Sequence, residues 1–160
     1  MPATSRTTDG SSGATAAGVP WPDWERVSQH LWWRELGCHD GTPYPRAWAH
    51  KAIVLATEFE VLRAMAGHQP LRVLSAYRTP MHNAKVGGAR WSQHLYGRAL
   101  DVRRPDGIDP EDWWQMALTC ARQPGSQIRG LGKYRSFVHF DIRPSARLVT
   151  WEASDAHHER

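Results

Sequence analysis

A single apolar stripe between residues 46 and 66 constrains the fold more than any other feature of this sequence. Its apolar residues recur at steps of three and four, which is the spacing of one face of an α-helix. They are Trp48, Ala52, Leu55, Phe59, Leu62 and Ala66. Glu58, Glu60 and Arg63 fall off this stripe, and Gly67 is a natural C-terminal stop. We therefore expect one long helix that packs its stripe on a partner surface.

Three short strands are predicted to supply that surface, at residues 71–77, 98–104 and 136–143. Successive side chains of a strand point to opposite faces, so the last segment has two distinct faces. One face carries Val138, Phe140 and Ile142, and the other carries Phe137, His139 and Asp141.

The remaining segments complete the predicted order of elements. Residues 109–122 form a helix with Asp109 as N-cap and Pro110 at the first helical position. Residues 23–37 are predicted to form a short helix, residues 78–92 a long loop, and residues 130–134 a turn. This order predicts the α+β class, with helices packed on a small antiparallel sheet.

Length and composition limit the functional classes. The 160 residues fit one domain, and 41% hydrophobic with 22% charged residues is typical of a globular protein. No apolar run is long enough for a membrane span. The net charge is +4, but no run of like charges indicates a nucleic-acid site, so we expect no nucleic-acid partner. We expect a monomer.

The termini and the cysteines add further expectations. We divide the chain into an N-terminal tail at 1–19, a domain at 20–151 and a C-terminal tail at 152–160. The first segment has no apolar core typical of a secretory signal, so we expect synthesis in the cytoplasm. Cys38 and Cys120 form no CxxC pair, which excludes a four-cysteine zinc site. Two buried free thiols are favoured, and a disulfide stays open.

His94, Asp101 and His139 form a candidate metal site. An isolated histidine on a strand is usually a core residue with a satisfied hydrogen bond, and neither histidine alone predicts a site. His94 and Asp101 flank a glycine-containing turn into one strand, and His139 can reach the same end from a neighbouring strand. Two imidazoles and one carboxylate leave a fourth tetrahedral position open, which is typical of catalytic rather than structural zinc.

Several segments of the chain together resemble the M15 zinc peptidases, the D-alanyl-D-alanine carboxypeptidase and peptidoglycan endopeptidase family. "SQHLYGRALD" resembles the family pattern S-x-H-x-x-G-x-A-x-D, and "SAYRTP" resembles S-x-Y-R-[ST]-P. "RELGCHDGT" and "GLGKYRSFVHFDIRPSARLVTW" resemble the early and closing segments of the subgroup that includes phage endolysins. The resemblance runs in order from about Glu35 to Trp151 and implies the fold shared by hedgehog and D-Ala-D-Ala peptidases.

The resemblance implies Zn²⁺ and a role for individual residues. His94, Asp101 and His139 match the zinc ligands, and Arg78 matches the arginine that holds a substrate carboxylate or an oxyanion. A second group is expected to bind substrate or to support these residues through hydrogen bonds, although turn, cap and loop-bracing roles stay open for some of them. This group comprises Ser75, Tyr77, His82, Asn83, Ser92 and Ser136.

The identity of the general base is the main departure from the family. Many M15 enzymes carry Asp or Glu three residues before the last ligand histidine, and here that position is Ser136. Asp141 shares the strand face of His139 and is the nearest alternative carboxylate; its other role would be to pair with Arg143 or a ring nitrogen.

The resemblance implies a zinc-dependent peptidase that cleaves peptidoglycan stem peptides, as a D-Ala-D-Ala carboxypeptidase or an endolysin-type endopeptidase. Its place of action would be the cell wall, as a phage-type lysin or a virion-associated protein, with a cytoplasmic D,D-dipeptidase as a rival. Ser136 keeps a different class open: a non-catalytic wall-binding or phage structural module that retains the fold and the metal.

Overall fold

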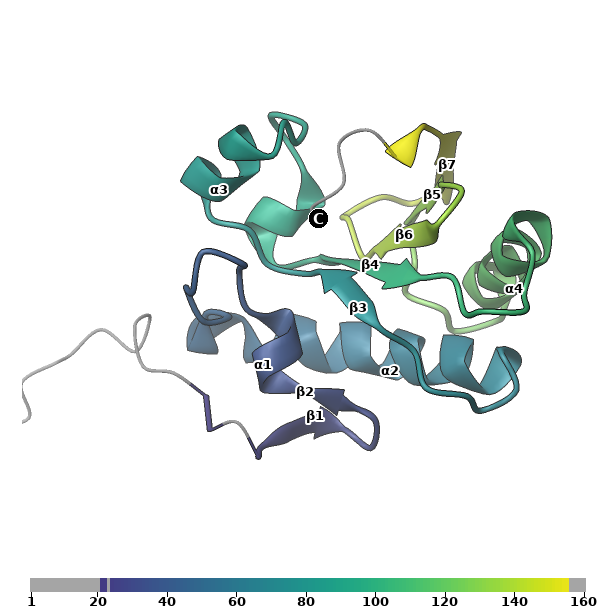
Figure 1. The fold of residues 1–160 in the computed structure, drawn as a ribbon, viewed down its shortest axis with the longest axis horizontal. Helices are drawn as coiled ribbons and strands as arrows, with labels where there is room; N and C mark the ends of the chain where they lie inside the picture. The colour runs from purple at the N-terminus through teal and green to yellow at the C-terminus, as the bar shows by residue number, and fades with distance from the viewer. Residues whose placement is uncertain (1–20, 23, 156–160) are drawn as a thin grey trace, which may run out of the picture.

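The protein forms one mixed sheet with its main helices on one side (Figure 1). A computed structural model describes residues 21–22 and 24–155, which include every element discussed below. The strands are β1 (Arg26–Ser28), β2 (Leu31–Trp32), β3 (Val73–Ser75), β4 (Ala99–Arg103), β5 (Gly130–Lys133), β6 (Phe137–Asp141) and β7 (Val149–Glu152). The helices are α1 (Trp33–Leu36), α2 (Ala49–Met65), α3 (Pro80–Lys85) and α4 (Pro110–Arg122), with 3₁₀ turns η2 (Arg46–Trp48) and η3 (Gln93–Tyr96).

The five-stranded sheet has the order β3-β4-β6-β5-β7, and β1 and β2 form a separate two-stranded ribbon. Neighbouring strands of the five-stranded sheet are antiparallel except β5 and β7, which are parallel. The register places Asp101 of β4 opposite His139 of β6, which in turn lies opposite Gly132 of β5. Ser75 and Trp151 extend this row at either end. One line across the sheet therefore joins residues that are far apart in the sequence.

The two faces of the sheet have different chemistry. Leu100, Val102, Val138 and Phe140 point into the core, where they meet the apolar stripe of α2 and the buried face of α4. Asp101, His139 and Asp141 alternate with them and lie on the opposite face, and all three are buried. The core therefore supports the sheet from one side, while the polar cluster occupies the other.

Much of the predicted fold is confirmed. The α+β class, the long helix with its buried stripe, and the capped helix at 110–122 are all present, and the Asp109 side chain accepts a hydrogen bond from the Asp112 N–H at the N-terminus of α4. Cys38 and Cys120 are free and buried. No helix in the described part of the chain is long and apolar enough to cross a membrane. The predicted tail at 1–19 and the last part of the one at 152–160 lie outside the described residues.

The helix predicted at 23–37 is wrong. The segment forms β1, β2 and only the four-residue α1, because polar contacts tie its turn to the long helix. The Glu60 carboxylate on α2 accepts hydrogen bonds from Ser28 Oγ at 2.6 Å and from the His30 N–H at 2.8 Å. Such long-range contacts override a local helical spacing.

Three smaller differences concern the sheet and the loop on its site side. The predicted loop at 78–92 contains α3, where Thr79 caps the first turn and Pro80 occupies its first position. The predicted turn at 130–134 is mostly strand β5. Strand β7 was not predicted, and it extends to Glu152, one residue past the predicted domain boundary.

Glu58 also departs from prediction, because it is buried on α2. Its carboxylate accepts hydrogen bonds from the Gln127 N–H at 2.6 Å and from Ser126 Oγ at 3.3 Å, which satisfies its buried oxygens.

The helix stripe yields a stability prediction. Leu55 is fully buried on α2, whereas Ile53 on the same helix is 57% exposed. We expect Leu55→Ala to lower the free energy of unfolding by about 2–5 kcal/mol, because it removes buried methyl groups and leaves a cavity. Ile53→Ala, the matched control, should change it by no more than about 0.5 kcal/mol. Urea denaturation measures both, and equal effects would contradict this packing.

Candidate metal centre

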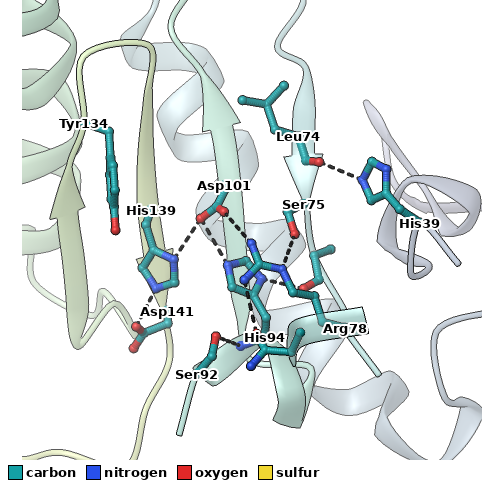
Figure 2. A network of polar contacts seen from close by, with 12 residues as sticks. His39, Leu74, Ser75, Arg78, Ser92, His94, Asp101, Tyr134, His139 and Asp141 are labelled. Atoms are coloured by element: carbon teal, nitrogen blue, oxygen red, sulfur yellow. Dashed lines mark hydrogen bonds and ion pairs between the residues drawn. The ribbon is translucent and has the colours of Figure 1, made fainter. Parts of the chain in front are cut away.

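His94, Asp101 and His139 converge on one point of the sheet's polar face (Figure 2). The Asp101 Oδ1 atom lies 3.2 Å from His94 Nε2 and 2.8 Å from His139 Nδ1. One nitrogen or oxygen atom from each residue lies within 4.8 Å of the others, and all three residues are buried. The structure thus brings together the three ligands predicted from the sequence.

Local structure around η3 positions His94. The Ser92 hydroxyl accepts a hydrogen bond from the His94 N–H at the start of this turn, and Gly97 ends it in the left-handed region with φ of 63°. A Cβ atom at residue 97 would lie 2.8 Å from the Trp48 ring, so glycine is required there by space as well as by conformation. On the ring itself, Nδ1 donates a short hydrogen bond to the Ala76 carbonyl, which directs Nε2 toward Asp101.

His139 is held from the other side by Asp141. The His139 Nε2 atom donates to Asp141 Oδ2 at 2.8 Å, so Nδ1 faces Asp101. The Asp141 carboxylate also accepts from Arg143 Nε at 2.8 Å and Nη2 at 2.7 Å, and it is completely buried. The opposite strand leaves room for it, since a Cβ atom on Gly130 would come within 2.3 Å of Asp141 Oδ2.

Arg78 lies at the far side of Asp101 and is 5% exposed. Its Nε donates to Ser75 Oγ at 3.0 Å, Nη1 to Asn83 Oδ1 at 3.4 Å and Nη2 to Asp101 Oδ2 at 3.5 Å. Two members of the predicted supporting group, Ser75 and Asn83, therefore fix the guanidinium. Asn83 in turn fills the space above Gly88, where a Cβ atom would lie 2.0 Å from Asn83 Oδ1.

The titration of the cluster reflects its burial and its charge. Burial lowers the pKa of His94, and this effect exceeds the attraction of Asp101. Burial raises the pKa of Asp101, but the two histidines outweigh it and hold that pKa well below its usual range. Burial lowers the pKa of His139, yet hydrogen bonds to Asp101 and Asp141 outweigh it and raise the pKa to about 9.

These residues fit a zinc ion. His94 Nδ1 must donate to a carbonyl, so in the neutral ring Nε2 carries a lone pair that faces an Asp101 oxygen at 3.2 Å. The His94 Nε2 lone pair and the Asp101 oxygen are both acceptors and repel each other at this distance, so a cation bound to both would stabilise them. His139 retains a proton on Nδ1, at the position from which a metal would displace it. Each ring also has its second nitrogen held by an acceptor, as zinc ligands usually do.

A cleft of about 480 Å³ opens over the cluster. Its walls include the segment 87–93, Tyr134 and Trp151, and three arginines line it: Arg78, Arg90 and Arg143. Among the described residues that line it, Asp101 is the only carboxylate. The cleft therefore has a positive lining around a buried acid that is itself a candidate metal ligand.

The remaining predicted residues lie outside this cleft. Tyr77 packs edge-on against the rings of Tyr44 and Trp48, and His82 lies on α3 with its ring stacked on His39 at 6.2 Å. Ser136 is exposed in the β5–β6 connection, and its carbonyl accepts from the Arg104 N–H. Ser136 therefore does not line the cleft in the position of a base.

Tyr134, Trp151, Arg143 and the segment 87–91 line the cleft but were not predicted as site residues. Two sequence signals bear on them: Tyr134, Arg143 and Trp151 fall within the closing segment that resembles the M15 subgroup, and Gly130 and Gly132 leave one face of β5 without side chains. That face is where Asp141 and the Trp151 ring lie.

The hydrogen bond between His139 and Asp141 yields a prediction on metal affinity. We expect Asp141→Asn to weaken zinc binding by about 10–100-fold. The neutral amide would orient the His139 ring less well than the carboxylate does, and it would leave the His139 ring less basic. Isothermal titration calorimetry with zinc measures this change. Asp106→Asn on the surface is the control and should bind like the wild type, while an unchanged affinity in Asp141→Asn would contradict the assigned support.

Comparison with known proteins agrees with this geometry. The family model described as peptidase M15 matches residues 29–141, which include all three candidate ligands. The zinc D-Ala-D-Ala carboxypeptidase of Streptomyces albus G is 28% identical over 81 residues, which cover 51% of this chain but 30% of that relative. The family and this relative imply zinc as the metal. The chain belongs to the peptidase M15 family.

Proposed function

We propose that this protein is a zinc-dependent peptidase that cleaves peptidoglycan stem peptides. The observation that carries the proposal is the His94–Asp101–His139 cluster at the base of a cleft with a cationic lining. The relative from Streptomyces albus G is named for an activity on D-Ala-D-Ala, and such peptides end in a carboxylate. A carboxylate-bearing substrate suits a cleft lined by three arginines.

The residues of the candidate site have different roles in the proposed reaction. Zinc, when bound, supplies a Lewis acid that polarises a carbonyl and lowers the pKa of water to about 7. His94, Asp101 and His139 hold the metal, while the Ala76 carbonyl and Asp141 keep the two rings in the required tautomers. Arg78, braced by Ser75 and Asn83, presents a fixed positive charge to the substrate.

Asp141 is better suited to position His139 than to act as a general base. Its oxygens accept from His139, from the Arg143 side chain and from the Arg143 N–H at 3.1 Å. The Arg143 side chain and His139 outweigh its burial and hold its pKa well below the usual range. A carboxylate stabilised in this way is a poor proton acceptor.

A non-catalytic wall-binding module is the second candidate function. The observation that favours it is the lining of the cleft, where the described residues offer no carboxylate besides Asp101. Such a module would keep the metal site and bind the wall without cutting it. The two candidates differ in one measurable property, the release of peptides from the wall.

Digestion of purified peptidoglycan tests the proposed function. We expect the protein to release peptides that mass spectrometry identifies, and we expect a chelator to stop the release and added zinc to restore it. The products also separate a carboxypeptidase, which releases D-alanine, from an endolysin-type endopeptidase, which cuts within stems or cross-bridges. Binding to the wall without any release would support the wall-binding module instead.

Ligand variants test the metal assignment. His94→Ala and Asp101→Ala should each lose stoichiometric zinc and wall digestion, because each removes one of three buried ligands. His68→Ala is the control, since that exposed histidine lies outside the cleft. Metal content by mass spectrometry and clearing on wall-containing gels give the two readouts, and full zinc retention in both ligand variants would refute the assignment.

Arg78→Lys tests the role of the fixed charge. Lysine keeps the charge but cannot match the three contacts that the guanidinium makes with Ser75, Asn83 and Asp101. We expect kcat/KM to fall by about 10²-fold or more with zinc still bound. Arg90→Lys, at the more exposed end of the same cleft, is the matched comparison and should lose less.

A further inference from the structure

Tyr134 lies in the connection between β5 and β6, at the wall of the cleft beside His139 (Figure 2). Its N–H donates to the Phe137 carbonyl at 3.2 Å, and its ring stacks on Phe137 with centroids 4.1 Å apart and planes 16° apart. The tight turn and the stacked ring hold the phenol in one orientation.

Trp151 fixes the hydroxyl of Tyr134 from the neighbouring strand. The Trp151 indole N–H donates to the Tyr134 hydroxyl at 3.3 Å. An indole N–H donates only, so the phenolic oxygen accepts and its own proton stays available. Among the described residues, none accepts that proton in a hydrogen bond that the structure records.

The position of Trp151 follows from the sheet. Parallel β7 places Trp151 beside Gly132, and a Cβ atom on residue 132 would lie 2.7 Å from the indole. The indole consequently lies across β5, with its ring 5.2 Å from the His139 ring and 5.1 Å from the Arg143 guanidinium. One aromatic ring thus connects the metal ligand to the tyrosine hydroxyl.

Two arginines of the cleft, Arg78 and Arg143, are engaged by neighbouring side chains, whereas, among the described residues, the Tyr134 hydroxyl only accepts. Arg78 donates to Ser75, Asn83 and Asp101, and Arg143 donates two bonds to Asp141. Tyr134 is a neutral donor with a fixed oxygen and a proton that can point into the cleft.

We propose that Tyr134 is a catalytic residue, whose hydroxyl donates a hydrogen bond to the oxygen of the scissile carbonyl as that oxygen becomes negatively charged. Trp151 is its positioning residue. The assignment rests on the proposed peptidase function and extends it to two residues with no role predicted from the sequence. A donor aimed in advance at a developing oxyanion stabilises the transition state more than the ground state.

Tyr134→Phe tests the proposal, because it removes the hydroxyl and keeps the stacked ring. We expect kcat to fall by about 10²–10³-fold, with KM changed by less than about threefold and zinc still bound at one equivalent. The affinity for a phosphinate analogue of the cleaved peptide should fall by the same factor as kcat/KM, since it mimics the tetrahedral oxyanion. This second readout does not depend on turnover.

Two further variants complete the experiment. Tyr96→Phe is the control, because that tyrosine does not line the cleft, and it should match the wild type in kcat and in phosphinate affinity. Trp151→Phe keeps a ring but removes the N–H donor, so we expect a smaller loss, of about tenfold, in kcat with KM retained.

The outcomes are separable. If Tyr134→Phe keeps kcat and phosphinate affinity within about threefold of an active wild type, the role of Tyr134 is refuted and the peptidase function stands. If the wild type releases nothing from peptidoglycan, the proposed function fails and this role fails with it. If Trp151→Phe behaves like the control, Trp151 does not position the hydroxyl.

Discussion

The pairing of β4 with β6 is the constraint on which the site depends. It sets Asp101 opposite His139, and alternation along the same strands sends Leu100 and Phe140 to the core. A slip of one residue would exchange the two faces, burying the acid among the helices and exposing leucine and phenylalanine. The apolar packing on α2 therefore selects the register that also brings the candidate metal ligands together, so the same contacts support stability and site geometry.

The negative charges of the two buried carboxylates in this site are balanced by arginine and histidine side chains in direct contact with them. Asp101 and Asp141 are buried carboxylates, and each contacts an arginine and at least one histidine. Buried ions require partners and hydrogen bonds, and removing one partner leaves an uncompensated charge. The two histidines keep Asp101 ionised, while Arg143 and His139 keep Asp141 ionised. A divalent cation at the three ligands would replace the proton on His139 without exposing either acid.

Sequence reasoning predicted the candidate ligands from a resemblance to the M15 family and from local patterns: a histidine and an acid around a glycine turn, and a histidine on an alternating strand. It also predicted α2 and α4, because the apolar spacing of the first and the N-cap of the second are local patterns too. It missed β5 and β7, because "GLGK" has the composition of a turn, and its pairing with β6 and β7 makes it a strand. Tyr134 and Trp151 enter the cleft through that pairing. The ribbon at β1 and β2 was missed because Glu60, far along the chain, sets its shape.

The two glycines of β5 constrain the register of the strand as well as leaving room for neighbouring side chains. Gly130 faces Asp141 and Gly132 faces the Trp151 ring, so the residues with no side chain must stay aligned with the residues that need the room. The short connection from Tyr134 to Ser136 sets that alignment. We expect that lengthening or shortening it by one residue would shift the register and place Leu131 or Lys133, in place of Gly132, opposite His139. The length of this connection therefore helps to set the geometry of the candidate metal centre, although none of the three candidate ligands lies in it.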